Sequence, residues 1–311
     1  MALLFGITMP FVGVLVRYRA NYTPKRLQGL AGEEAAEDPV ASIGYFGMMK
    51  RVHRIEGWAG LYKGIMPSIV TSLIAIVVVS PLAIFLSPGH RVLPNGQVSV
   101  PPQFVLGPMW ILNFALSLVP SLLLIPMQII TNRTITTPHT LAAFAPSAAL
   151  RVLLSPAERA QPLRLYLSPG VALAVLLEAF FTPLLSLLLA LALPHLFRAH
   201  HGSLMYLAVA LPTVVFGTAL LTPLQVMFTR LTLQRRGETP DAPAVADAPP
   251  AYAEDVLDVR TQQAPYTSLF DCARQIVREE GWRVLYRAWW LTALSLVLAM
   301  GAPMVPLAPP V

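Results

Sequence analysis

Long uncharged apolar runs alternate with charged segments along this 311-residue chain. The four longest runs cover 65–89, 92–132, 165–197 and 199–229, and shorter ones cover 1–16 and 288–311. Because about 20 helical residues cross the hydrocarbon layer of a membrane, each long run suffices for a span. The third run holds a single acid, Glu178. The pattern predicts an all-α integral membrane protein with six transmembrane helices.

The basic residues indicate on which side of the membrane the connections lie. Of 22 lysines and arginines, all but Arg91 and Arg198 fall in three segments, 17–63, 133–164 and 230–287. Basic residues close to the spans mark the side that is not translocated. We therefore expect the three large loops on one side, called here the loop side, and both termini on the other.

The composition argues against several classes of function. The net charge of +6 belongs to these membrane-flanking loops, so nucleic acid is not expected as a partner. The single cysteine, Cys272, excludes an intrachain disulfide and a cysteine-based metal site, and the six histidines have no ligand spacing. No nucleophile and base recur together, and no phosphate-binding loop is present. We therefore expect no metal, no cofactor and no enzyme activity.

A proline recurs three times in the apolar runs, each time followed seven residues later by an arginine. The pairs are Pro10–Arg17, Pro126–Arg133 and Pro223–Arg230. Seven residues are two helical turns, so each proline and its arginine share a helical face. The prolines are interpreted as helix kinks, because proline removes one backbone hydrogen bond. The arginines are expected to extend to the membrane interface, with a gating function as the alternative.

A second motif, called here the acid-glycine motif, follows the first proline by about 50 residues. It reads EGWAGLYKG from Glu56 and EGWRVLYRA from Glu280. The corresponding stretch of the middle unit, RAQPLRLYLS, has Ala160 and Gln161 in place of the acid and the glycine. An amphipathic segment precedes each motif, most clearly TSLFDCARQIVREEG. The chain thus divides into three repeats of span, surface helix and span, at 1–90, 101–198 and 203–311.

With these motifs the sequence resembles the mitochondrial carrier family. The resemblance implies a six-helix bundle with pseudo-threefold symmetry, proline-kinked odd helices, three surface helices on the matrix side and a central cavity. The sequence departs from the family where it forms the matrix salt-bridge network. The acid positions hold Val12, Gln128 and Gln225, and the first base positions hold Leu15, Thr131 and Phe228. The gate on the opposite side also lacks its ion pairs.

The resemblance places the main substrate contacts at Thr71, Val175 and Ser295. None of these is charged, so a large polyanion is a poor substrate, because a desolvated phosphate or carboxylate needs a fixed counter-charge. Glu178 shares a helical face with Val175 and with Thr182. An acid within a span is costly and usually faces a cavity or a partner. We expect a small solute bound by these five residues; a hydrogen-bonded packing role for Glu178 is the alternative.

The resemblance also implies lipid sites, including cardiolipin sites, at the acid-glycine motifs. Glycines and bases where a surface helix meets a span suit an anionic headgroup. The candidate residues are Gly57, Tyr62, Lys63, Gly64, Gly281, Tyr286 and Arg287. Interfacial anchoring by these aromatic and basic residues is the alternative. The segment 237–265 is rich in proline, alanine and acids and is predicted to be a disordered insertion.

Two functions are compatible with these features. The first is solute transport by alternating access, which the resemblance implies, with an inner mitochondrial membrane location. The second is a carrier-derived adaptor of the outer mitochondrial membrane that acts in membrane fusion or dynamics and no longer transports. The missing salt-bridge networks and the altered motif of the middle repeat favour the second. The retained motifs of the outer repeats favour the first.

Overall fold

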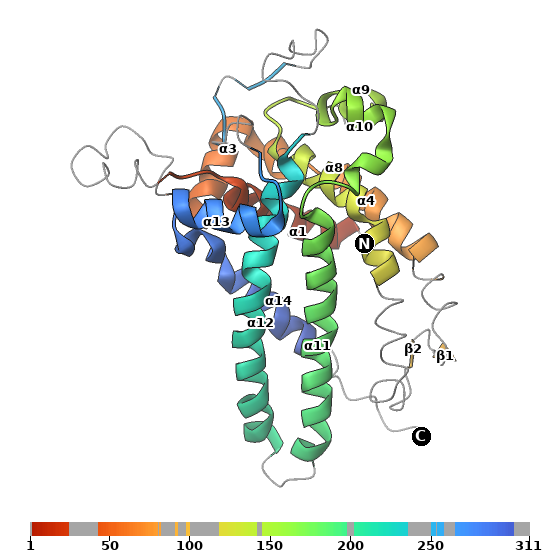
Figure 1. The fold of residues 1–311 in the computed structure, drawn as a ribbon, viewed down its shortest axis with the longest axis vertical. Coiled ribbons are helices and arrows are strands. Elements are labelled where there is room, and N and C mark those ends of the chain that lie inside the picture. The colour runs from red at the N-terminus through yellow and green to blue at the C-terminus, as the bar shows by residue number, and fades with distance from the viewer. Residues whose placement is uncertain are drawn as a thin grey trace, which may run out of the picture.

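The computed structural model describes residues 2–24, 43–79, 81, 91–92, 98–99, 118–141, 145–197, 202–235, 250–252, 254–257 and 265–301. The described part is mostly helical, as the apolar runs predicted, with one short antiparallel pair of two-residue strands, β1 (Arg91–Val92) and β2 (Val98–Ser99). Two long helices, α11 and α12, run side by side, and the shorter helices gather around one end of this pair (Figure 1).

The helices follow one another in three groups. The first holds α1 (Ala2–Ala20), α3 (Tyr45–Leu61) and α4 (Ile65–Ile74), which continues as the π-helix η1 (Ala75–Val79). The second holds α8 (Ile125–Thr136), α9 (Pro146–Leu153), α10 (Pro156–Ala160), the 3₁₀-helix η2 (Pro162–Leu165) and α11 (Val171–Phe197). The third holds α12 (Gly202–Leu233), α13 (Leu269–Glu279), the 3₁₀-helix η3 (Trp282–Tyr286) and α14 (Trp289–Gly301). The three predicted repeats and their boundaries stay a prediction.

Within the described residues, one helical stretch is long and apolar enough to cross a membrane by itself, Ala208–Leu233 of α12. The segments Tyr45–Leu61 and Ile65–Val79 pass the same test only as a pair, with a bend of 47° between them. Val171–Leu185 of α11 is a shorter apolar helix. Six separate spans are therefore not confirmed, and much of the predicted second and third spans lies outside the described residues.

The three prolines take different positions. Pro10 lies inside α1 and Pro223 inside α12. Pro126 lies instead in the first turn of α8, just after the break at Leu124. Proline fits the first turn because its missing N–H would have no partner there. Helical residues 118–123 precede the break, so the helical stretch is interrupted just before this proline.

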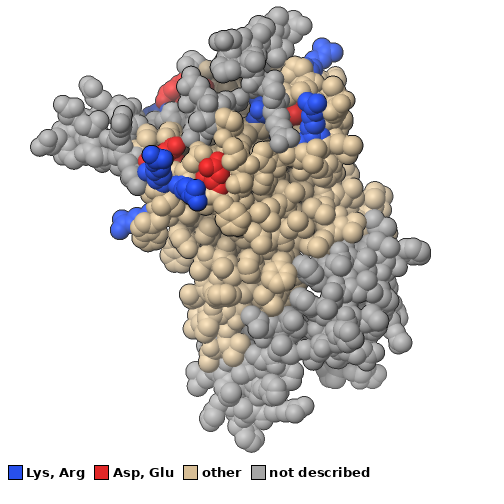
Figure 2. Space-filling model, viewed as in Figure 1, with Lys and Arg blue, Asp and Glu red and all other residues tan. Residues whose placement is uncertain are grey.

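Two buried apolar clusters hold the described part together. The larger lies between α8, α11, α12, α13 and η3 and includes Ile129, Val175, Leu231 and Ile276. The smaller joins α1, α3, α14 and residues 256–257. In Figure 2 the charged side chains of the described residues lie at the end of the molecule where α3, α13, α9 and α10 gather. This distribution agrees with the predicted loop side.

Candidate functional site

A buried ion pair joins the end of α12 to the turn after α13. Arg230 contacts Glu280 with both terminal nitrogens, and Nη2 lies 3.0 Å from Oε2. The two side chains are 4% and 0% exposed. A buried charge is tolerated when it is paired and hydrogen-bonded. The arginine that follows Pro223 therefore fastens its helix to the acid of its own acid-glycine motif.

The first repeat makes the same contact. Arg17 of α1 forms a salt bridge with Glu56, and its Nη1 donates to the carbonyl oxygen of Gly60 at 2.9 Å. The second carboxylate oxygen of Glu56 accepts a hydrogen bond of 2.6 Å from Lys63. Both oxygens of this buried acid thus have a cationic partner.

The middle repeat also has the pair, although its motif lacks the expected acid. Arg133 donates from Nη1 and Nη2 to Glu158 at 2.7 and 2.9 Å. Glu158 lies two residues before the position taken by Ala160. Ser155 caps α10 by accepting from the Glu158 amide, and the Glu158 carboxylate accepts from the Ser155 amide. A capping box therefore holds the acid in place.

These pairs correct one prediction from the sequence. The arginines do not extend to the interface: Arg17, Arg133 and Arg230 are 1%, 3% and 5% exposed. The buried acids account for the outcome, because a buried charge is tolerated when it is paired and hydrogen-bonded. The sequence Ser155-Pro-Ala-Glu158 carried the capping-box signal that would have identified the acid of the middle repeat.

The backbone conformation explains why a glycine follows the acid in the acid-glycine motif. Gly57 and Gly281 have φ values of +67° and +104°, in the region that side chains with a Cβ rarely adopt. The backbone turns sharply there, just after the paired acid. In the middle repeat Glu158 lies inside a helix instead, so no glycine is required after it.

The base of the motif contacts the neighbouring repeat. Lys63 donates to the carbonyl oxygen of Thr137, which caps the C-terminus of α8, at 2.9 Å. Arg287 donates to the carbonyl oxygen of Tyr18, near the C-terminus of α1, at 3.3 Å, and also to that of Asn21. Cations stabilise helix C-termini, where carbonyl groups lack partners. The motif base therefore caps a helix of the next repeat.

Two of the paired arginines extend these contacts around the three repeats. Arg133 donates from Nε to the carbonyl oxygen of Thr232 at 2.9 Å, and Arg230 donates from Nη2 to that of Asn21 at 2.9 Å. Together with the Lys63–Thr137 contact they join repeat one to two, two to three and three to one. We call these contacts the loop-side ring. They hold the loop-side ends of α1, α8 and α12 together.

These contacts also bear on the predicted lipid sites. Burial, with repulsion from Arg230, lowers the pKa of Arg287 to about 10, although Glu280 and Tyr18 oppose the shift. The hydroxyl of Tyr62 donates to the Gly6 carbonyl oxygen at 3.1 Å, and that of Tyr286 lies 3.4 Å from the Ala219 carbonyl oxygen. Four of the seven candidate side chains thus have partners inside the protein. Lipid binding at Gly57, Gly64, Gly281 and their neighbours stays a prediction.

Part of the segment predicted to be disordered packs against two other repeats. Residues 250–252 and 254–257, called here the strap, pair with the chain after α8, where the amides of Thr140 and Tyr252 donate to the carbonyl oxygens of Pro250 and Pro138. Glu254 forms salt bridges with Arg51 and Arg54 of α3. The prediction of disorder is therefore wrong for these residues; the rest of 237–264 lies outside the described residues.

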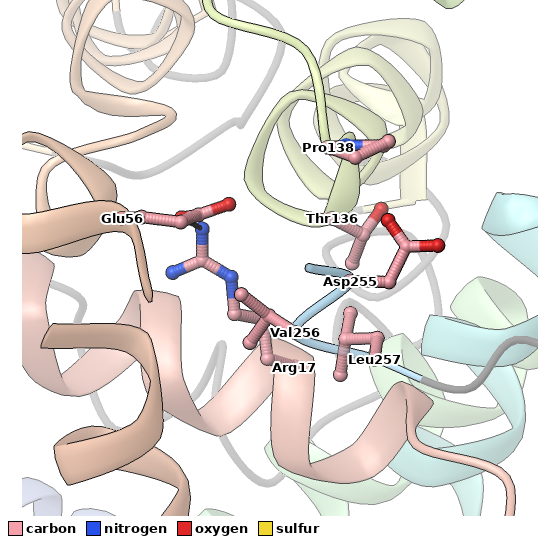
Figure 3. A pocket seen from close by; sticks show the side chains of 7 residues that line it. All are labelled: Arg17, Glu56, Thr136, Pro138, Asp255, Val256 and Leu257. Atoms are coloured by element: carbon pink, nitrogen blue, oxygen red, sulfur yellow. Dashed lines mark hydrogen bonds and ion pairs between the residues drawn. The ribbon is translucent and has the colours of Figure 1, made fainter. Parts of the chain in front are cut away.

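The apolar residues that end the strap explain why it is held. Val256 and Leu257 are 6% and 8% exposed and belong to the smaller apolar cluster. Figure 3 shows them beside a polar pocket of about 370 Å³ in which the guanidinium of Arg17 meets Glu56, with Thr136 and Asp255 on the other side. The composition of the segment did not reveal these two apolar residues, because alanines and acids outnumber them.

A second cavity lies between the helices of all three repeats. Its volume is about 320 Å³, and its lining includes apolar residues of α1 and α12 and a set of polar groups. The polar lining residues are Arg19, Gln128, Asn132, Glu178, Gln225, Thr229, Thr292 and Ser295. We call this the central cavity, since it lies where the carrier resemblance predicted one.

A chain of hydrogen bonds crosses the central cavity. Arg19 of α1 donates from Nη2 to Gln225 Oε1 of α12 and to the Thr292 hydroxyl of α14, both at 2.9 Å. Gln225 donates in turn from Nε2 to Glu178 Oε1 of α11 at 3.0 Å. The Thr292 hydroxyl also lies 3.0 Å from Gln225 Oε1. Four helices thus meet at one neutral amide between a cation and an acid.

The structure brings together two of the five predicted solute residues. Glu178 and Ser295 line the central cavity. Val175 is 6% exposed in the larger apolar cluster, and Thr71 donates to the Pro67 carbonyl oxygen within its own helix. Thr182 donates to the Glu178 carbonyl oxygen and is exposed. These three residues do not line the cavity in this conformation.

Sequence reasoning missed Arg19 and Thr292 and noticed Gln225 only as a departure. Gln225 stands at an acid position of the family motif and accepts from Arg19 there, so a neutral contact replaces an ion pair. Arg19 carried a weak signal, since it lies two residues after the expected arginine at a helix end. Among the described residues, no group of three or more His, Cys, Asp or Glu side chains could hold a metal ion.

The described residues thus form a set of helices that are joined at their loop-side ends around a polar cavity. Residues 200–305, which contain α12 to α14 with the Arg230–Glu280 pair, match the family model described as mitochondrial carrier protein. Over these residues the chain is similar to mitochondrial carrier proteins, as its motifs predicted. No curated protein matches the sequence.

Proposed function

We propose that this protein carries a small solute across the inner mitochondrial membrane by alternating access through the central cavity. The observation that supports this most is the hydrogen-bonded chain from Arg19 through Gln225 to Glu178, which places a cation, an acid and hydroxyl groups on the cavity wall. Polar groups at membrane depth are costly, and a solute pathway accounts for them. With a volume of about 320 Å³ the cavity suits a small solute rather than a large polyanion.

In this proposal the loop-side ring is the gate that closes the central cavity on the loop side. Its contacts join neighbouring repeats through side chains that bond backbone carbonyl groups at helix ends. The buried arginine–glutamate pairs, by contrast, lie within single repeats. Opening on the loop side would therefore separate the repeats at the ring while each repeat keeps its own ion pair.

The adaptor alternative loses one of its arguments. The altered motif of the middle repeat suggested decay, but Glu158 supplies the buried acid from a capping box. All three repeats thus have a buried arginine–glutamate ion pair. Membrane lipid, including cardiolipin at the backbone of the acid-glycine motifs, remains the proposed environment, and the oligomeric state is left open.

Glu178→Gln should lower the uptake of any solute that the reconstituted wild type transports by about tenfold or more. The substitution keeps size and removes the charge, and a hydrogen bond to a charged group contributes about 1.5–3 kcal/mol. Uptake into liposomes is measured for both proteins, with Glu279→Gln as a control acid outside the cavity. Equal uptake and equal pH profiles for Glu178→Gln and wild type would remove Glu178 from the mechanism. Uptake of no solute by folded wild type would contradict transport itself.

A further inference from the structure

The central cavity holds a cation with unused bonding capacity. Arg19 is 6% exposed, and its Nε has no hydrogen-bond partner, whereas its Nη2 bonds Gln225 and Thr292. All of these acceptors are neutral. A buried guanidinium is better satisfied by a carboxylate, which accepts two parallel N–H groups. The open Nε therefore indicates that a carboxylate ligand belongs beside Arg19.

The amide that separates the two charges has a fixed polarity. Gln225 turns its oxygen toward Arg19 and its nitrogen toward Glu178. This assignment follows from the partners, because the guanidinium only donates and the carboxylate accepts. A molecule that carries an anionic group and, a short distance away, a cationic group would pair the anionic group with Arg19 and the cationic group with Glu178.

We infer that the central cavity binds a small zwitterion, such as a short neutral amino acid, with its carboxylate at Arg19 and its ammonium group at Glu178. The inference rests on the proposed transport function and names its substrate class. The zwitterion takes the place of the Gln225 amide and adds charge-assisted hydrogen bonds at both ends. Thr292 and Ser295 supply hydroxyl groups on the same wall.

Singly charged solutes fit this cavity less well. A lone amine pairs with Glu178 and adds a second cation beside Arg19. A lone carboxylate pairs with Arg19 and adds a second anion beside Glu178. Either leaves a net charge in a desolvated site, which is unfavourable unless the charge is compensated. A zwitterion leaves the cavity neutral.

Binding in this way also changes the contacts between helices. When the solute displaces the Gln225 amide, the hydrogen bonds that join Gln225 of α12 to the side chains of Arg19 and Glu178 are lost. A ligand moves a conformational equilibrium only through different contacts in the two states. The displaced amide provides such a difference, so solute binding favours separation of the repeats.

The test compares alanine with ethylamine and propionate, which lack its carboxylate and its ammonium group respectively. Thermal unfolding of the purified full-length protein is measured with each at the same concentration, since a ligand that binds the folded state raises Tm. Wild type should be stabilised by alanine alone. Gln225→Ala should show a larger shift with alanine, because the competing amide is gone. Glu178→Gln should lose most of the alanine shift and gain one with propionate, and Glu279→Gln should behave as wild type.

The outcomes separate this inference from transport. Stabilisation of wild type by ethylamine or propionate as strong as that by alanine overturns the zwitterion assignment, as does an alanine shift unchanged in Glu178→Gln. No shift with any of the three, while another solute enters liposomes, overturns the assignment and leaves transport standing. An alanine shift without any uptake leaves the binding site standing and contradicts transport.

Discussion

Replacing Glu280 with alanine is expected to destabilise the protein by about 3–5 kcal/mol, the range found when one partner of a buried ion pair is removed. Glu280 is 3% exposed, and its carboxylate binds the guanidinium of Arg230. It also accepts from the backbone amide of Thr23 at 2.9 Å, which ties the third repeat to the first. Alanine leaves the buried Arg230 charge without a carboxylate partner, bonded only to backbone carbonyl oxygens and to the side chain of Tyr266.

The free energy of unfolding, measured by denaturant titration in detergent, gives this effect. Glu279→Ala is the matched control, because the neighbouring acid is only partly buried and accepts from the hydroxyl of Tyr22 at 3.0 Å. It should cost less, about 1.5 kcal/mol, at the lower end of the range for a hydrogen bond to a charged group, because Glu279 is partly exposed. Equal effects of the two substitutions would show that the pair with Arg230 does not stabilise the fold.

Glu158→Ala should have an effect of the same size, about 3–5 kcal/mol, although Glu158 lies outside the motif position of the family. The substitution removes both contacts with Arg133, whose side chain is 3% exposed, and also breaks the capping box with Ser155. The loss of the cap adds about 1 kcal/mol. The middle repeat should therefore be as sensitive as the third.

Arg159→Ala provides the control for this position, since Arg159 is exposed on the same short helix. Surface substitutions of this kind change stability by about 0.5 kcal/mol or less. A small effect of Glu158→Ala, comparable to that of Arg159→Ala, would mean that the middle repeat has lost its internal fastening. That result would restore one of the two arguments for a non-transporting adaptor.

The sequence predicted the order of elements well because the signals were local. Each signal lies within one or two helical turns: a proline and an arginine seven residues apart, an acid before a glycine, or an amphipathic segment. The role of the arginines was missed because it depends on a partner 25 to 50 residues away, as in the pairs Arg133–Glu158 and Arg230–Glu280. Burial of the acid and the arginine together decides that contact, and neither position shows its burial in the sequence.

The central cavity was predicted less completely. Glu178 stood out because it is an acid within an apolar run, and Ser295 followed from the family resemblance. Arg19 lies at the end of α1 beside other basic residues, and Thr292 is an ordinary polar residue of α14. Only the packing of four helices brings these side chains to Gln225. The strap was missed for a similar reason, since its position depends on Val256 and Leu257 meeting a cluster of the first repeat.

Labelling of a single cysteine in the central cavity from the two sides of a membrane tests alternating access most directly. The variant is Ser295→Cys in a Cys272→Ala background, because Cys272 is the single natural cysteine and Ser295 lines the cavity. A membrane-impermeant maleimide is added to oriented proteoliposomes, outside in one sample and enclosed in the other. We predict labelling from both sides, with the loop-side rate the slower because the loop-side ring must open. Labelling from one side only, or from neither side, would contradict transport through this cavity.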